Sequence, residues 1–179
     1  MTGPLVFLLS GWSGSGKDAA AHLLREEMRF ERLAFADVLK SDVSQKTGVP
    51  LHYFHDRELK DTGVPTPRQL LIDEARVQRL QDPDIYSRRV ADIIRTTMRS
   101  KRYVITDWRY RREYDYFASE LGDHVRIIRG RIIRSGIIPS DDPTEHDLDH
   151  ETFDIVLRND GTISDLRDAL SRLLRMYGL

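Results

Sequence analysis

Short apolar runs alternate with longer amphipathic segments along the chain. The apolar runs predict five strands, at residues 4–10, 32–35, 103–106, 124–129 and 153–157. Apolar residues at helical spacing predict helices at residues 17–28, 37–47, 68–80, 84–99, 111–121 and 164–177. Asp37 is expected to cap the second of these helices and Ser164 the last.

This alternation predicts an α/β domain with a parallel sheet covered on both faces, because parallel strands need crossover connections. We expect one domain over residues 1–179 with about five strands between two helical layers. Two long polar excursions interrupt the pattern, at about residues 48–80 and 130–151. Ligands bind beyond the carboxyl ends of parallel strands, so both excursions are expected to close over a site there.

A glycine-rich turn joins the first predicted strand to the first predicted helix. The run from Gly11 to Lys17 reads G-x-x-x-x-G-K, and it has the strand before it and the helix after it that this motif requires. Such a loop points successive backbone N–H groups at an anion, and the positive end of the helix adds to the field. We therefore expect a P-loop NTPase fold in which Lys17 contacts the outer phosphates of a nucleotide. The expected nucleotide-binding residues are Gly11, Ser13, Gly14, Ser15, Gly16, Lys17, Asp18 and Ala19.

Other interpretations of the same turn are weaker. Gly14-x-Gly16-x-x-Ala19, with Asp37 about 20 residues on, also fits a loose dinucleotide-binding pattern. That pattern has no use for a lysine inside the loop, whereas the longer phosphate motif is complete. A plain glycine turn with a surface lysine would leave the agreement of strand, loop and helix unexplained.

Two aspartates are candidates to organise Mg²⁺. Asp18 stands where a hydroxyl residue is usual, and a carboxylate also holds Mg²⁺ directly or through water. Asp107 ends the apolar run 103–106, the place of an aspartate that orients the metal in phosphate-loop enzymes. A helix cap is the alternative interpretation of Asp107, and the phosphate loop favours the role in the site.

Arginine and lysine residues in and beside the excursions are candidates to bind phosphate. The first excursion supplies Arg57, Lys60 and Arg68, and the second supplies Arg129, Arg131 and Arg134. Lids that bring arginines over a transferring phosphoryl group exclude water and neutralise charge. His146 and His150 have metal-ligand spacing, but their loop context makes a metal site a weak hypothesis.

Charge and composition narrow the function classes. Lysine and arginine number 28 against 29 acidic residues, so the net charge is −1 and a general nucleic-acid or membrane-surface binder is disfavoured. The chain has no cysteine, which excludes disulfides and thiolate chemistry. The N-terminal apolar run is too short for a signal peptide or membrane span, and a cytoplasmic location is the default expectation.

Several motifs together resemble the bacteriophage-type deoxynucleoside monophosphate kinases. In that family's order they are GWSGSGKD at 11–18, FADVLK at 35–40, DRE at 56–58, PRQL at 67–70, TDxR at 106–109 and NDG at 159–161. The GKD ending and the TDxR segment also resemble animal-type phosphomevalonate kinases. The DRE and PRQL segments look more like the nucleotide enzymes.

The resemblance implies an ATP- and Mg²⁺-dependent kinase that phosphorylates a nucleoside monophosphate. Asp18 and Asp107 would organise the metal, and Arg131 and Arg134 would come from the lid. Asn159 to Gly161 would contact adenine, and the acceptor phosphate would be held by Lys40, Arg57, Arg68 and Arg109. The chain departs from the family pattern at two places: Ala19 replaces a threonine that is common after GKD, and residues 146–149 match the lid pattern only loosely.

Three other functions remain open at this point: a phosphomevalonate kinase, a nucleotide-binding switch without an acceptor, and a nucleic-acid binder, which the charge disfavours. The sequence leaves the accepted bases unassigned and leaves a homodimer open. Tyr53, Phe54, Tyr86 and Trp108 are candidates to stack on a base, although core packing is the commoner role of such residues.

Overall fold

A computed structural model describes residues 4–56, 58–97, 102–139 and 141–178. Its centre is a sheet of five parallel strands in the order β2-β3-β1-β4-β5. The strands are β1 (Leu5–Ser10), β2 (Phe30–Leu33), β3 (Arg102–Ile105), β4 (Arg126–Ile133) and β5 (Ile155–Arg158). Every residue of β1 is buried, as expected for the middle strand of a sheet covered on both faces.

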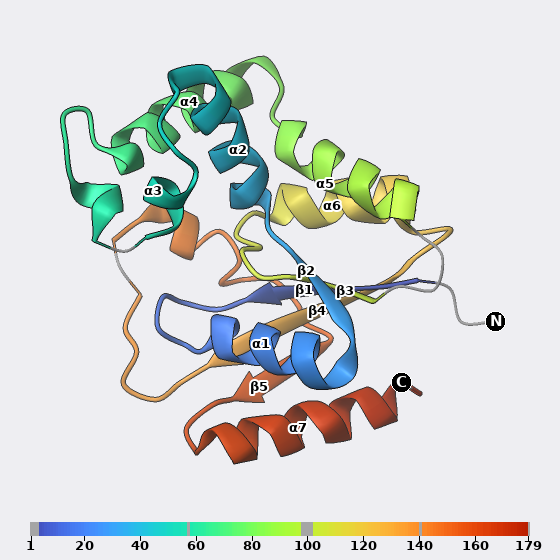
Figure 1. The fold of residues 1–179 in the computed structure, drawn as a ribbon. Helices are drawn as coiled ribbons and strands as arrows, with labels where there is room; N and C mark the ends of the chain where they lie inside the picture. Colours follow the sequence, from blue (N-terminus) through green and yellow to red (C-terminus); the bar gives the residue numbers. More distant parts are fainter. Residues whose placement is uncertain (1–3, 57, 98–101, 140, 179) are drawn as a thin grey trace.

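Helices cover both faces of the sheet, so the domain has three layers (Figure 1). On one face lie α1 (Lys17–Met28) and α7 (Ile163–Met176). The other face carries α2 (Phe35–Thr47), α4 (Pro67–Gln81), α5 (Ile85–Thr97) and α6 (Arg111–Leu121), with the short α3 (His52–His55) at the outer edge.

Alternate side chains of the central strand feed two separate cores. Val6 and Leu8 pack with helices α2, α5 and α6, while Leu5, Phe7 and Leu9 pack with α1 and α7. This two-sided burial holds the end of β1 in place between two neighbouring strands, and the loop that follows it begins from a rigid support.

The structure confirms the predicted fold class and corrects several element boundaries. Helices 17–28 and 111–121 have the predicted bounds. Helix α2 begins at Phe35, so Asp37 lies in its first turn and does not cap it. Thr162, not Ser164, caps α7: its side chain accepts from the Asp165 amide, and the Asp165 carboxylate accepts from the Thr162 amide in return.

The two excursions lie at the edge of the sheet where the strands end (Figure 1). The first contains α3 and a 3-10 turn, Leu59–Asp61, before α4. The second starts later than predicted because β4 continues to Ile133, so residues 130–133 are strand. We call residues 134–154 the lid segment; it contains the 3-10 turn Pro143–Glu145. Within the described ranges, no helix has the length and apolarity to cross a bilayer.

Candidate functional site

The turn between β1 and α1 curls as the glycine pattern predicts. Gly11, Gly14 and Gly16 have φ values of 144°, 82° and 105°, a region that side chains disfavour. A Cβ on Gly16 would lie 2.1 Å from Asn159 Nδ2, and one on Gly11 would lie 2.4 Å from the Ile132 carbonyl oxygen. Close packing and backbone conformation therefore both require glycine at these two positions.

Asn159, directly after the edge strand β5, fixes this turn. Its buried side chain donates from Nδ2 to the Ser15 carbonyl at 2.8 Å. The side-chain nitrogen of Asn159 therefore supports the loop backbone, and the contact of Asn159 with adenine stays a prediction. Gly161 lies in the exposed turn before α7 and stays a predicted adenine contact.

Lys17 opens α1 and reaches back over the turn. Its Nζ donates to the carbonyl oxygens of Gly11 and Trp12, the second at 2.9 Å. Burial lowers the pKa of Lys17 and the Arg109 guanidinium lowers it further, while the carboxylates of Glu145, Asp18 and Asp107 oppose the shift. The attraction between this ammonium group and a nearby anion is strong, because the partly buried site has a lower dielectric constant than water.

A cavity of about 420 Å³ lies in front of the turn. We call it the phosphate cavity; its lining comes from the turn, from the ends of β2 and β3, and from the start of α2. The lining residues are Ser13, Gly14, Gly16, Lys17, Asp18, Arg32, Ala34, Ala36, Asp37, Lys40, Thr106, Asp107 and Arg109. Gly11, Ser15 and Ala19, which were also expected beside the nucleotide, are not among them. Ser15 is buried within the turn, and Ala19 packs against the core.

Asp107 combines the two interpretations that the sequence left open. Its two carboxylate oxygens accept from the backbone amides of Phe35 at 3.0 Å and Ala36 at 2.8 Å, which caps the start of α2. It also lines the phosphate cavity with Asp18, and burial raises its pKa above the usual range. The cap holds this carboxylate in place at the cavity wall.

The two aspartates fit a Mg²⁺ ion that is shared with a nucleotide. Among the described residues no group of three or more His, Asp or Glu side chains could hold a metal by itself. Mg²⁺ is usually held through one or two carboxylates together with substrate phosphates and water. Asp18 and Asp107 supply that number of carboxylates on one cavity.

Three further cations join Lys17 on the same cavity, namely Arg32, Lys40 and Arg109. Lys40 Nζ lies 3.3 Å from an Asp37 carboxylate oxygen and 3.3 Å from His55 Nδ1. Burial and the Lys40 ammonium lower the pKa of His55, which keeps that ring neutral beside the lysine. The structure thus gathers two of the predicted acceptor-binding residues, Lys40 and Arg109, and adds Arg32.

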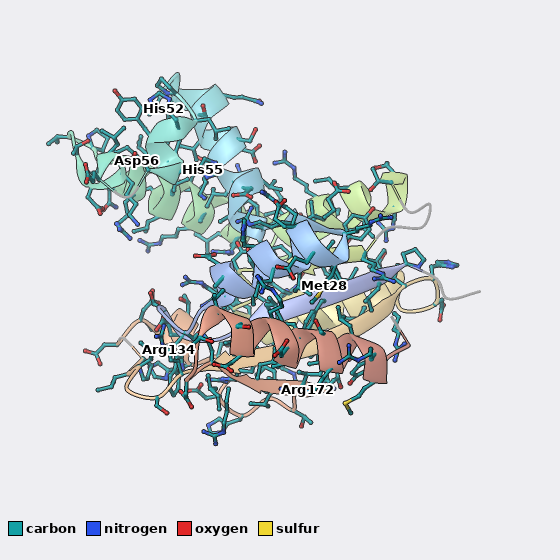
Figure 2. The ribbon with its side chains drawn as sticks, turned by 60° about the horizontal axis from the view of Figure 1, so that its bottom comes forward. Met28, His52, His55, Asp56, Arg134 and Arg172 are labelled. Carbon is teal, nitrogen blue, oxygen red and sulfur yellow. The ribbon has the colours of Figure 1, made fainter. Side chains whose placement is uncertain are left out.

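Of the other predicted phosphate-binding arginines, Arg68 and Arg134 do not line this cavity. Arg57 lies outside the described residues. Arg68 forms a two-bond pair with Asp61, at 2.5 and 2.9 Å, on the exposed side of α4. Arg134 is exposed on the loop after β4, well apart from the lobe that carries His52, His55 and Asp56 (Figure 2).

Arg131 belongs to β4, which corrects its expected place in the lid. Its guanidinium lies 5.3 Å from the ring centroids of both Trp12 and Phe153. It donates to the Leu148 carbonyl at 2.9 Å and to Asp149 at 2.6 Å. Arg131 therefore ties the lid segment to the sheet beside the phosphate turn.

The lid segment makes three more contacts with the site. The Ser13 amide donates to Glu145 Oε1 at 3.2 Å, so a lid carboxylate lies on the phosphate turn. Arg109 donates to Thr144 Oγ1 at 3.0 Å, and the Arg111 amide donates to Asp147 at 2.7 Å.

The metal-ligand spacing of His146 and His150 does not lead to a metal site among the described residues. His146 Nδ1 forms a hydrogen bond with Asp149 at 2.9 Å, and no described group of three or more metal-ligating side chains includes the two histidines.

A second cavity, of about 250 Å³, adjoins the phosphate cavity. The two share Ala36, Asp107 and Arg109 in their walls. We call the second one the acceptor cavity; its other lining residues are Phe35, Leu39, Arg79, Tyr86, Tyr110, Glu113, Asp142 and Thr144.

Sequence reasoning found one of these residues and missed others. Tyr86 was a candidate to stack on a base, and it lines the acceptor cavity. Phe54 and Trp108 are buried in the core instead, and Tyr53 packs on the His52 ring. Arg79 and Glu113 belong to no motif; only their inward positions on amphipathic helices could have indicated them.

Comparison with known proteins supports the fold. No protein-family model and no curated protein matches the chain. A Mycobacterium tuberculosis APS kinase, CysC, solved with AMPPNP and APS, superposes with a TM-score of 0.54 at 13% identity, covering 98% of this chain and 99% of that one. Dephospho-CoA kinase from Campylobacter jejuni superposes with a TM-score of 0.51 at 9% identity, covering 97% of each chain. A sugar kinase from Janibacter superposes with a TM-score of 0.51 at 13% identity, covering 96% of this chain and 95% of that one. At these identities the likeness shows that the chain has the fold of P-loop kinases.

Proposed function

We propose that the protein transfers the γ-phosphoryl group of ATP to the phosphate of a nucleoside monophosphate, with a deoxynucleotide as the expected acceptor. The observation that carries this proposal is the joining of two cavities through Asp107 and Arg109. One cavity begins at a phosphate-binding turn, and the other has room and aromatic walls for a second molecule. A nucleotide-binding switch would have no use for the second cavity.

In this proposal the turn binds the donor. The backbone amides of residues 11–16 and the ammonium of Lys17 surround the β- and γ-phosphates, and the N-terminal end of α1 adds its positive field. Asp18 and Asp107 hold Mg²⁺, which when bound would neutralise charge on the phosphates.

Lys40, Arg109 and Arg32, which line the same phosphate cavity, bind the acceptor phosphate. A phosphate acceptor is already ionised, so no general base and no covalent intermediate is required. These side chains accelerate the reaction by aligning two anions that repel each other in water and by stabilising the charge between them. The lid segment, tied down through Arg131 and Thr144, excludes water from the transfer.

The test is a panel of the ribo- and deoxynucleoside monophosphates, and of phosphomevalonate, each with ATP and Mg²⁺. Formation of a nucleoside diphosphate from one or more monophosphates is the expected result. Transfer to phosphomevalonate alone would show that the alternative from the sequence is correct. ATP binding with slow hydrolysis and no transfer would show a switch protein.

A further inference from the structure

Three cavities follow one another from the phosphate turn outward. The phosphate cavity and the acceptor cavity share Arg109. The acceptor cavity in turn adjoins a third one, of about 460 Å³, and these two share Arg79, Tyr86, Tyr110 and Glu113. Arg79 therefore lies farther from the turn than Arg109 does, at the end of the acceptor cavity away from the phosphates.

Two aromatic rings hold the Arg79 guanidinium in place. Its central carbon lies 5.2 Å from the ring centroid of Tyr86 and 5.1 Å from that of Tyr110. In the part of the chain that the structure describes, no carboxylate forms an ion pair with it. Contact with aromatic rings orients the planar group but leaves most of its N–H donors unused.

Two more polar groups at the same junction have unused bonding capacity. The Tyr86 hydroxyl is buried and has no hydrogen-bond partner, and burial raises the pKa of this phenol to about 12. Glu113 Oε2 accepts hydrogen bonds from the backbone amides of Arg109 and Tyr110, at 3.0 and 3.1 Å. Burial raises the pKa of Glu113 to about 8, and within the described residues no hydrogen bond to Oε1 accompanies the two that Oε2 accepts.

A ligand for this junction must be flat and must carry hydrogen-bond acceptors. The walls offer the apolar surfaces of Phe35, Leu39 and two tyrosine rings. The polar groups at the junction include two donors, the guanidinium of Arg79 and the phenol of Tyr86, and the carboxylate of Asp142 adds an acceptor to the acceptor cavity. A nucleobase has this combination of planar faces and edge acceptors, whereas a branched aliphatic chain does not.

We propose that Arg79, held between Tyr86 and Tyr110, binds the base of the acceptor nucleotide and selects among acceptors. This inference rests on the proposed function. It adds to that function the residue that recognises the base, the part of the acceptor farthest from the transferred phosphoryl group. Arg79 is half-buried, and a ligand that covers its donors without bonding to them removes them from water at a cost, so an acceptor that satisfies Arg79 is favoured over one that does not.

The test is steady-state kinetics of Arg79→Ala and Arg79→Lys with each of the four deoxynucleoside monophosphates. For the preferred acceptor, KM should rise at least tenfold in both variants, and the spread of kcat/KM among the four acceptors should shrink. The KM for ATP should change less than threefold, because the turn is untouched. Arg79→Lys keeps the charge but lacks the planar fork, so it should not restore selectivity.

Arg76→Ala is the matched control, since Arg76 is exposed on the same helix, one turn earlier. It should leave every constant within twofold. Tyr86→Phe tests the buried hydroxyl without changing the ring, and it should raise the acceptor KM several-fold while KM for ATP stays constant.

The outcomes separate the two proposals. Transfer by the wild-type protein, with an unchanged acceptor KM and unchanged selectivity in both folded Arg79 variants, overturns the role of Arg79 alone. A wild-type protein that binds ATP but phosphorylates no nucleoside monophosphate overturns the proposed function, and the role of Arg79 with it. Thermal melting of each variant establishes that it is folded.

Discussion

The phosphate turn and the acceptor cavity are built from different parts of the polypeptide. The turn is a stretch of consecutive residues, 11–17, whose binding groups are backbone amides and one lysine. The acceptor cavity is made of side chains from α2, α4, α5 and α6 and from the lid segment. A site made of backbone is vulnerable to an added Cβ, whereas a site made of side chains is vulnerable to their truncation.

The largest expected effect is at the one charged side chain of the turn. Lys17→Met should leave a folded protein whose phosphoryl transfer is about a thousandfold slower, because loss of a preorganised charge at a transferring group costs about 10²–10³ in rate. Lys46→Met, at the exposed end of α2, is the control and should keep full activity. Near-normal turnover of Lys17→Met would show that the turn does not hold the transferred phosphate.

The next effect tests whether the turn depends on its backbone. Gly16→Ala and Gly48→Ala both place a side chain at positive φ, but only position 16 has an obstructing atom, Asn159 Nδ2. Both variants should lose about 1–2 kcal/mol of unfolding free energy from left-handed backbone strain, and Gly16→Ala should lose more. ATP binding, measured by calorimetry, should weaken at least tenfold only in Gly16→Ala. Equal ATP affinities would contradict the account of the turn.

On the acceptor side, Glu113 predicts a dependence of stability on pH. Burial raises the pKa of Glu113 to about 8 in the folded protein, against 4.5 for the free group. The folded state therefore binds more protons between these values, and the stability from this group is full at acidic pH and falls as pH rises through 8. The loss is on the order of a few kcal/mol.

Glu113→Gln keeps an oxygen for the two backbone amides and removes the titration. Its unfolding free energy should fall less between pH 6 and pH 9 than that of the wild type, as measured by urea denaturation. Glu120→Gln, exposed on the same helix, should follow the wild type. Parallel curves for the wild type and Glu113→Gln would rule out the raised pKa.

The smallest effect concerns the lid, where Glu145 lies on the Ser13 amide. A carboxylate at this place opposes an incoming phosphate by repulsion and by occupying a donor. Glu145→Gln should tighten ATP binding about threefold, on the scale of an exposed charge interaction. Asp141→Asn, exposed elsewhere in the lid segment, should not change it. Weaker binding in Glu145→Gln would mean that the lid carboxylate helps nucleotide binding.

The contrast between the two regions also explains what the sequence could predict. The turn, α1 and the strand before it were predictable because one continuous motif encodes them, and α1 has the predicted bounds. Asp107 was found because it ends a strand, although its cap on α2 joins residues more than 70 positions apart and could not be seen.

Residues of the acceptor side were harder to predict because tertiary packing decides which polar side chain faces a cavity. Arg68 belongs to the PRQL motif, yet it pairs with Asp61. Arg79 lies on the same helix and belongs to no motif, yet it lines the acceptor cavity. Arg131 was assigned to the lid because the predicted strand ended at residue 129, whereas β4 continues to Ile133 with buried residues that alternate with half-buried ones. An apolar pattern alone does not reveal the full length of a strand in which arginines occupy half-buried positions.

A crystal structure with a bisubstrate analogue, two nucleosides joined by a chain of phosphates, tests the central claim most directly. The account predicts that the phosphate chain runs from the amides of residues 11–16 and Lys17 to Lys40 and Arg109, with one base beside Arg79. A phosphate chain bound away from the turn, or a turn that stays closed over Lys17 with no phosphate on its amides, would contradict it.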